Sequence, residues 1–390
     1  MAPEKIDAKS LSVINGNGHP AYVCAVLAGG KGSRLGGIDK SQLKAGEQTF
    51  LERITEELKR LGTPCYLSAA AYPHVSGGGL EVITDYPLNV NASGGQIGPL
   101  GGMLSCLEET GADCIFFVPC DMPGFRAEMA SLLAAGAEDD SWDCLLWQTR
   151  DGRIHPACGF YMKRCIPAMK EAIKAGNYRL RDLCSLLKCR IVRTAEMHIP
   201  DCWFRNINDE ASFKAYTEAR QKHVIFAVSG KKNTGKTTLL EKLVEELSAR
   251  GIRTAVIKHD GHDFEPDVPG TDSWRLKKAG AYGTVIFSGE RYCVVKDQRD
   301  MKTEDFLLFF PEADLILLEG HKSTPWRKLE LLRKEVSALP VCDPDTVVVY
   351  AADWIEAGNT GVINGRPVIS RDDTEKMLEI IISEMDKENF

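Results

Sequence analysis

The chain has 390 residues, which is enough for two ordinary domains that each bury a core. Its 48 Lys and Arg against 55 Asp and Glu give a formal net charge of −7, and this disfavours sequence-blind nucleic-acid binding, which needs many cations against phosphates. With 44% hydrophobic and 26% charged residues, and no apolar run near the ~18 residues of a membrane span, the composition excludes global disorder and a membrane protein.

The N-terminal segment and the cysteines bear on the compartment. Residues 1–20 lack the apolar core of a secretory signal, and we expect a short disordered tail there. None of the 13 cysteines has the C-x-x-C spacing of a zinc or redox site, and several lie in apolar strands, where reduced thiols behave as small hydrophobes. We therefore expect structural thiols, a reducing compartment and a cytoplasmic protein.

The first predicted element is a strand at 22–27 that leads into a Gly-rich loop. Such a continuous apolar run is typical of a strand buried on both faces of a parallel sheet. The loop is not a dinucleotide-binding fingerprint, because Leu35 stands where the third glycine is required. Its backbone N–H groups can instead wrap a triphosphate, and its cations can neutralise the charge that develops as pyrophosphate leaves, which favours a nucleotidyltransferase. The candidate residues of this loop are Gly29, Gly30, Arg34 and Lys40.

Helices and strands alternate along the rest of the N-terminal half. Thr49 and Glu52 form a capping box that begins a helix reaching about Leu61. Further strands are predicted at 81–84, 114–118 and 144–147. This alternation indicates an α/β domain.

Three segments of this half could complete a site beside the loop. Asp121 follows a buried strand, where α/β sheets present Mg²⁺ ligands and substrates, or else it caps the next helix. The tight loop at 98–102 can approach a base or ribose closely, or is a plain structural turn. The side-chain amides in the segment 206–208 either bind a ligand or cap the last helix. The candidates in these two segments are Gly98, Pro99, Leu100, Asn206 and Asn208.

The boundary between the halves follows a charged, helix-like stretch at 209–222. A second apolar strand begins directly after it, at 224–229, and again leads into a Gly-rich loop. The two loops do not align as a repeat. We therefore predict two different domains, at 21–218 and 223–390, with a short linker at 219–222.

The second Gly-rich loop, GKKNTGKT at 230–237, matches G-x-x-x-x-G-K-[ST] at every fixed position. Its glycines permit a turn that aims backbone N–H groups at phosphate oxygens, and the helix N-terminus that follows adds a positive dipole end. The lysine can reach the β and γ phosphates, and the threonine hydroxyl can ligate Mg²⁺. The spacing therefore predicts a nucleoside triphosphate site. The expected ligands are Gly230, Gly235, Lys236, Thr237 and Thr238.

The elements after this loop extend the α/β pattern. A helix is predicted at 236–250, ended by Gly251. Glu319 follows an apolar run and is expected to support the metal, whereas Asp314 before that run is the weaker candidate. The stretch 259–263, His-Asp-Gly-His-Asp, is either a metal cluster or a solvated loop. The strands predicted here are 253–258, 284–287, 314–318 and 346–350.

This phosphate loop occurs with four other strings, which are VIKH at 256–259, HDF at 262–264, PG-x-DS at 269–273 and EGHK at 319–322. Together they resemble the small GTP-binding adapter protein of molybdopterin-guanine dinucleotide synthesis, over most of 223–390. The resemblance implies GTP binding and assistance to a guanylyltransferase. The residues that it implies are Gly230, Gly235, Lys236, Thr237, Asp272 and Glu319.

The N-terminal motifs, read as a set over 21–218, resemble the molybdenum cofactor guanylyltransferase within the molybdopterin nucleotidyltransferase family. The resemblance implies that Asp121 binds Mg²⁺ beside the α-phosphate of GTP. It implies that the molybdopterin side is lined by 155–156, 179–182 and 206–208. The GTP contacts that it implies are Leu27, Ala28, Gly29, Lys40 and Asp85.

The sequence departs from this family at three places. Leu35 replaces a methionine after the loop arginine, which conserves volume and matters little. Ser68 stands where the family has an asparagine that contacts the nucleotide, and that contact is in doubt. Residues 88–96 form an insertion between Asp85 and Gly98.

The two resemblances imply two three-layer α/β/α domains, a Rossmann-like nucleotidyltransferase followed by a P-loop NTPase-like domain. The expected reaction transfers GMP from GTP to Mo-molybdopterin with Mg²⁺ and releases pyrophosphate, with molybdoenzyme-maturation proteins as further partners. A cytidylyl- or sugar-1-phosphate nucleotidyltransferase is one alternative, although Leu-Ala-Gly-Gly goes with guanine in the resembled family. A GTP-responsive binding or chaperone module is the other, and the coexistence of Arg34, Lys40 and Asp121 argues against it.

Overall fold

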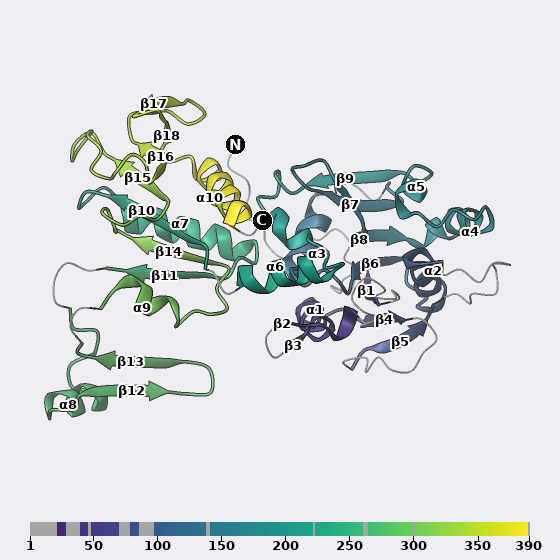
Figure 1. Ribbon diagram of the computed structural model, residues 1–390, viewed down its shortest axis with the longest axis horizontal. Coiled ribbons are helices and arrows are strands. Elements are labelled where there is room, and N and C mark those ends of the chain that lie inside the picture. The colour runs from purple at the N-terminus through teal and green to yellow at the C-terminus, as the bar shows by residue number, and fades with distance from the viewer. Residues whose placement is uncertain are drawn as a thin grey trace. The chain divides into compact units, whose positions relative to one another are not determined.

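The chain folds into two compact units, each built around a seven-stranded sheet (Figure 1). The first unit takes the described residues of 1–222 with 245–252 and 375–390, and the second takes those of 223–244 and 253–374. No helix among the described residues is long and apolar enough to cross a membrane. This computed structural model describes residues 22–28, 40–45, 48–69, 79–85, 97–137, 141–220, 223–259, 264–298 and 301–388.

The sheet of the first unit has the order β5-β4-β1-β6-β8-β7-β9. All its neighbours are parallel except at β8, which runs antiparallel to both β6 and β7. The parallel expectation is therefore wrong at β8, because a short turn around Gly152, with φ +82°, returns the chain directly beside β7. The strands are β1 (Val23–Leu27), β4 (Cys65–Ala69), β5 (Glu81–Thr84), β6 (Cys114–Pro119), β7 (Cys144–Gln148), β8 (Ile154–Met162) and β9 (Cys189–Arg193).

Helices cover both faces of this sheet. Along β6, Ile115 and Phe117 pack into one core cluster with Leu104, while Phe116 between them packs edge-on against Phe160 on the other face. The predicted capping box is confirmed, since Thr49 caps α1. The remaining elements of this part of the chain are η1 (Lys40–Gln42), β2 (Lys44–Ala45), β3 (Gln48–Thr49), α1 (Phe50–Lys59), α2 (Pro99–Glu109), α3 (Ala127–Ala135), η3 (Lys163–Cys165), α4 (Ile166–Lys174), α5 (Leu180–Cys184), η4 (Asp201–Phe204) and α6 (Glu210–Arg220).

The sheet of the second unit has the order β11-β14-β10-β15-β16-β18-β17, parallel except for β17. The predicted phosphate-loop helix begins at Lys236 as expected and ends at Ala249, before Gly251 with φ +77°. The elements of this part of the chain are β10 (Ile225–Gly230), α7 (Lys236–Ala249), β11 (Thr254–Lys258), α8 (Asp272–Lys278), β12 (Gly283–Phe287), β13 (Tyr292–Lys296), α9 (Thr303–Leu307), β14 (Leu315–Glu319), β15 (Lys328–Leu332), β16 (Val347–Ala352), β17 (Gly361–Ile363), β18 (Arg366–Ser370) and α10 (Thr374–Glu388).

Two strands of the second unit stay apart from its main sheet. β12 and β13 pair with each other only, as an antiparallel hairpin that Figure 1 shows beside α8. The predicted strand at 284–287 is thus confirmed, but it belongs to this hairpin and not to the parallel sheet. The main sheet therefore supplies the buried strands on which the phosphate loop rests.

Candidate functional site

In the first unit, the candidate site lies where three parallel strands end side by side. The N–H of Ala28 donates to the carbonyl of Ser68 at the end of β4, at 2.8 Å. The N–H of Cys120 donates to the carbonyl of Leu27 after β6, at 3.0 Å. The carboxyl edge of a parallel sheet is the usual ligand-binding edge of α/β folds. Ala28, the last described residue before the Gly-rich stretch of the sequence, therefore lies at this edge.

A lysine joins the three segments that the sequence singled out. Lys40 lies in η1, and its ammonium donates to Asp121 Oδ2 at 2.9 Å and to Asn208 Oδ1 at 2.6 Å. The N–H of Ile207 also donates to the Asp121 carbonyl, at 2.8 Å. The fold thus brings together three predicted site residues that are separated by as many as 168 positions in the chain.

The carboxylate of Asp121 fits a divalent cation. Its Oδ1 atom is buried and has no hydrogen-bond partner within the part of the chain that the structure describes, while Oδ2 is engaged by Lys40. A buried carboxylate oxygen without a donor is costly unless a cation or another polar group occupies its free side. Mg²⁺ takes oxygen ligands and uses one or two carboxylates beside substrate phosphates. The donor set at Asp121 is therefore of the right chemistry for Mg²⁺.

A second carboxylate follows the edge strand β5. Asp85 accepts a hydrogen bond from the hydroxyl of Ser68 at 2.6 Å, and burial raises the pKa of Asp85 against the opposing effect of that bond. Gly102 of α2 makes the close packing possible, since a Cβ there would lie 2.1 Å from Ser68 Oγ and 2.8 Å from Asp85 Oδ1. The serine at the family's asparagine position therefore holds a neighbouring acid in place.

The other predicted residues of this unit divide into three groups. Gly98 precedes α2 with φ +71°, and Pro99 is the first residue of that helix. Leu100 is fully buried. Asn206 is half-buried beside the Asn208 segment. Gly29, Gly30, Arg34 and the insertion at 88–96 lie outside the described residues.

His155 lies within β8, in a segment that the resemblance assigned to the molybdopterin side. Its Nε2 is 3.1 Å from the hydroxyl of Thr149, and its ring packs on Phe204 with centroids 4.8 Å apart. Burial, reinforced by Arg153, lowers the pKa of His155 to about 4. The imidazole is therefore neutral near pH 7.

In the second unit, the phosphate loop joins β10 to α7 with the backbone that a nest of N–H groups requires. Gly230, Asn233 and Gly235 have φ values of +143°, +65° and +94°. A Cβ at Gly230 would lie 2.7 Å from the carbonyl oxygen of Leu331, so this glycine is also required by packing. Lys236 donates to the carbonyl of Lys231 across the loop, at 2.7 Å. Burial is the largest cause of the lowered pKa of Lys236.

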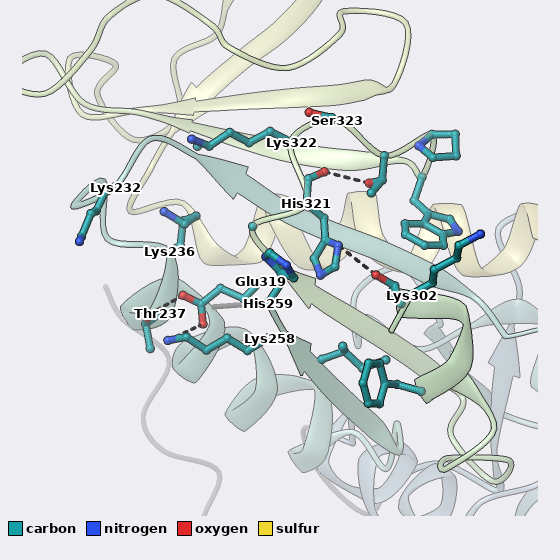
Figure 2. A pocket seen from close by; sticks show the side chains of 18 of the residues that line it. Lys232, Lys236, Thr237, Lys258, His259, Lys302, Glu319, His321, Lys322 and Ser323 are labelled. Atoms are coloured by element: carbon teal, nitrogen blue, oxygen red, sulfur yellow. Dashed lines mark hydrogen bonds and ion pairs between the residues drawn. The ribbon is translucent and has the colours of Figure 1, made fainter. Parts of the chain in front are cut away.

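The predicted metal residues of this loop are in contact. The hydroxyl of Thr237 donates to Glu319 Oε1 at 2.7 Å, and Lys258 lies 3.4 Å from Oε2 of the same carboxylate (Figure 2). Glu319 ends the buried strand β14, whereas Asp314 precedes that strand and pairs with Arg253. The paired oxygens of Thr237 and Glu319 fit Mg²⁺, which supports the choice of Glu319 over Asp314.

A pocket of about 1040 Å³ opens above this loop. Its far wall includes Lys302, His321 and Trp326, none of which the sequence singled out individually as a ligand. Lys328, fully buried in β15, shapes this wall by donating to the carbonyls of His321, Lys322 and Thr324. The sequence carries no clear signal of this role, because Lys328 directly follows Arg327 and begins the strand.

Two expectations for the second unit have different outcomes. Asp272, which the resemblance implied, lies on α8 with a side chain that is 95% exposed, and it is not among the residues that line the pocket. His259 does line the pocket, with its ring 5.9 Å from that of His321. The rest of the candidate metal cluster, 260–263, lies outside the described residues.

Comparison with known proteins gives a family for each half. A family described as MobA-like NTP transferase domain matches residues 24–192, and MobB, molybdopterin guanine dinucleotide synthesis protein B, matches residues 225–353. A probable molybdenum cofactor guanylyltransferase from Clostridium perfringens is 31% identical over 169 residues, which are 43% of this chain and 79% of that protein. The molybdopterin-guanine dinucleotide biosynthesis adapter protein of Haemophilus influenzae is 38% identical over 131 residues, 33% of this chain and 73% of that protein.

The adapter protein of Escherichia coli is 32% identical over 173 residues, which are 42% of this chain and 95% of that protein. The chain belongs to both families. Both resemblances drawn from the motifs are thereby confirmed, as is the assignment of two α/β domains. The MobA-like half contains Lys40 and Asp121, and the MobB half contains the phosphate loop and Glu319.

Proposed function

We propose that this chain transfers GMP from GTP to Mo-molybdopterin and releases pyrophosphate, and that its MobB half binds a second GTP as a fused adapter. The names of the relatives in both families support this proposal. The observation that carries it is the pair of hydrogen bonds from Lys40 to Asp121 and Asn208 at the carboxyl edge of the sheet. A cation fixed there can face the phosphates of a nucleotide held by the adjoining loop.

The transfer is a single displacement at phosphorus. An oxygen of the terminal phosphate of molybdopterin forms a bond to the α-phosphorus of GTP, and the bond from that phosphorus to the pyrophosphate oxygen breaks. Such chemistry is mostly positioning and charge neutralisation, and no covalent enzyme intermediate is required. We assign the neutralising charge to Lys40 and Arg34. Mg²⁺ held by Asp121 would supply further positive charge to the phosphates.

The remaining roles follow from where each residue lies. We assign the nucleotide contacts to the loop that follows Leu27 and Ala28 and to Asp85. His155, neutral and seated against Phe204, is suited to a hydrogen bond with a neutral heterocycle, and we assign it to the molybdopterin side together with 179–182.

In the MobB half, we propose that GTP occupies the pocket above the phosphate loop. Lys236 would exchange its bond to the Lys231 carbonyl for the β and γ phosphates, and Thr237 with Glu319 would hold Mg²⁺. We place the two domains at 21–218 and 223–390, which include the two matched regions.

The test uses the full chain with Mg²⁺, molybdenum-loaded molybdopterin and either GTP or CTP. We expect pyrophosphate release and a guanine dinucleotide product, identified by mass, from GTP alone. Formation of a cytosine dinucleotide would contradict the proposed base specificity. If no dinucleotide formed with GTP or with CTP, the proposed function would be wrong. Removal of divalent metal with a chelator should stop the release.

The metal role is tested with Asp121→Ala, which should abolish turnover while the chain stays folded. Asp113→Ala is the matched control, because Asp113 is an exposed acid directly before the other end of β6. Turnover in Asp121→Ala equal to that of the control would remove the proposed role.

A further inference from the structure

Three cysteines of the first unit converge on one point, and none of them is among the residues assigned above. The sulfur atoms of Cys144, Cys184 and Cys189 all lie within 4.8 Å of one another. Those of Cys144 and Cys189 are 2.6 Å apart. Among the described residues, this is the one group of three metal-ligating side chains at such separations. Spacing along the chain does not predict this cluster, because the first cysteine and the last are 45 positions apart.

The fold places each thiol by a different element. Cys144 begins β7 and Cys189 begins β9, and the two residues are direct partners in this parallel pair. Side chains of strand partners point to the same face of a sheet, so the two sulfurs meet. Cys184 is the last residue of α5 and adds the third sulfur from above that face.

The arrangement is that of a thiolate metal site. In a tetrahedral zinc site with Zn–S of about 2.3 Å, pairs of sulfurs lie ~3.8 Å apart. This distance lies between the 2.6 Å from Cys144 to Cys189 and the 4.8 Å limit that holds for the whole cluster. Cys144 is buried, whereas Cys184 and Cys189 are half-buried, so the site is reachable from solvent.

We propose that Cys144, Cys184 and Cys189 bind one thiophilic metal ion, Zn²⁺ or Cu⁺. Three sulfur ligands suit either ion, since soft thiolates select both. No fourth protein ligand joins the three in the described chain, so Zn²⁺ would complete its shell with water and Cu⁺ would be three-coordinate.

Binding at this site would fasten α5 to the sheet. The hydroxyl of Tyr161 lies 3.9 Å from the sulfur of Cys184 and donates to the carbonyl of Pro156 at 2.6 Å. Residues 179–182 of the same helical segment and Pro156 both belong to the region assigned to molybdopterin. The ion would therefore order one wall of that region, although the site itself does not depend on the assigned reaction.

The experiment titrates the reduced, metal-stripped full chain with Zn²⁺ and with Cu⁺, each against a competing chromophoric chelator. Cd²⁺ is a third probe, because its thiolate complexes absorb in the near ultraviolet. We expect one equivalent to bind, and Cys184→Ser or Cys189→Ser to lower the affinity at least ~10-fold, the lower end of the effect of losing an outer-shell partner.

Cys65→Ser is the matched control, since Cys65 is also a half-buried cysteine of the first unit but lies outside the cluster. It should bind metal as the unaltered chain does. Circular dichroism checks that each variant is folded. If Cys184→Ser does not fold, Cys189→Ser is used as the test variant instead. Equal affinity in a folded cluster variant and in the control would overturn the proposal. So would a Cys144–Cys189 disulfide in chain that was prepared under reducing conditions and takes up no metal.

Discussion

Lys40 shows how much of the candidate site depends on single side chains. Its ammonium bonds Asp121 and Asn208, so it is fixed before any substrate arrives. A fixed cation costs no reorganisation when charge develops on a departing pyrophosphate. The bond to Asp121 also pairs two side chains that are largely buried.

We therefore expect Lys40→Ala to lower the rate of pyrophosphate release by ~100-fold or more, the cost of losing one preorganised donor. Lys44→Ala is the control, because Lys44 is an exposed lysine only a few residues further along the chain. Steady-state kinetics with GTP and molybdopterin measure the effect. A Lys40→Ala enzyme as active as the control would show that this lysine is not part of the machinery.

The lowered pKa of His155 predicts that the stability of the folded chain depends on pH. Its pKa falls from 6.5 to about 4 on folding, chiefly through burial, so below pH 6.5 the unfolded chain binds the proton more readily than the folded one. The contribution of neutral His155 to the free energy of unfolding is thus complete above pH 6.5, and it is lost as the pH falls toward 4. The thermal midpoint of the unaltered chain should drop over this window more steeply than that of His155→Gln. If the thermal midpoints of the two proteins fell in parallel with pH, the lowered pKa of His155 would be contradicted.

Among the elements, β15 connects the core of the second unit to its pocket. Lys328 is fully buried in this strand and donates to three carbonyls of the loop that walls the pocket. Burial is the largest cause of the lowered pKa of Lys328. Two residues along, Glu330 is also buried and accepts from the N–H groups of Val341 and Cys342, so the strand organises loops on both sides of it.

Lys328→Met should lower the free energy of unfolding by about 1–3 kcal/mol, because it leaves buried acceptors without a donor. It should also weaken GTP binding at the phosphate loop, since the wall of the pocket loosens. Urea unfolding and nucleotide titration measure the two effects, with the exposed Lys334→Met as control. If the variant were as stable as the control, the three hydrogen bonds would contribute nothing net.

β15 and β8 also show which elements a sequence pattern misses. Lys328 and Glu330 interrupt the apolar run that indicates a buried strand, and their partners lie in loops whose positions only the fold decides. The antiparallel direction of β8 likewise depends on the short turn before it. By contrast β6, β7 and β14 were predicted nearly to the residue, because their apolar runs are continuous and are ended by polar or small residues.

For the whole molecule, the two nucleotide sites predict a binding stoichiometry. The full chain should bind two GTP molecules, and Lys236→Ala should bind one, because that variant removes the cation of the phosphate loop. Lys242→Ala, an exposed lysine of α7, is the control. Isothermal titration with a non-hydrolysable GTP analogue measures the number of sites. If Lys236→Ala still bound two GTP analogues, the proposal that the phosphate loop binds GTP through Lys236 would be contradicted.

The sequence by itself determined both family assignments, and it predicted two phosphate loops and the site residues Asp121 and Glu319. These features are local, because the turn of a Gly-rich loop and the acid at the end of an apolar strand are set by neighbours in the chain. Tertiary structure alone decided that Asn208 meets Lys40, that Lys328 holds the pocket wall and that three distant cysteines share one point. Such contacts follow from strand order and register, which residue spacing along the chain does not encode.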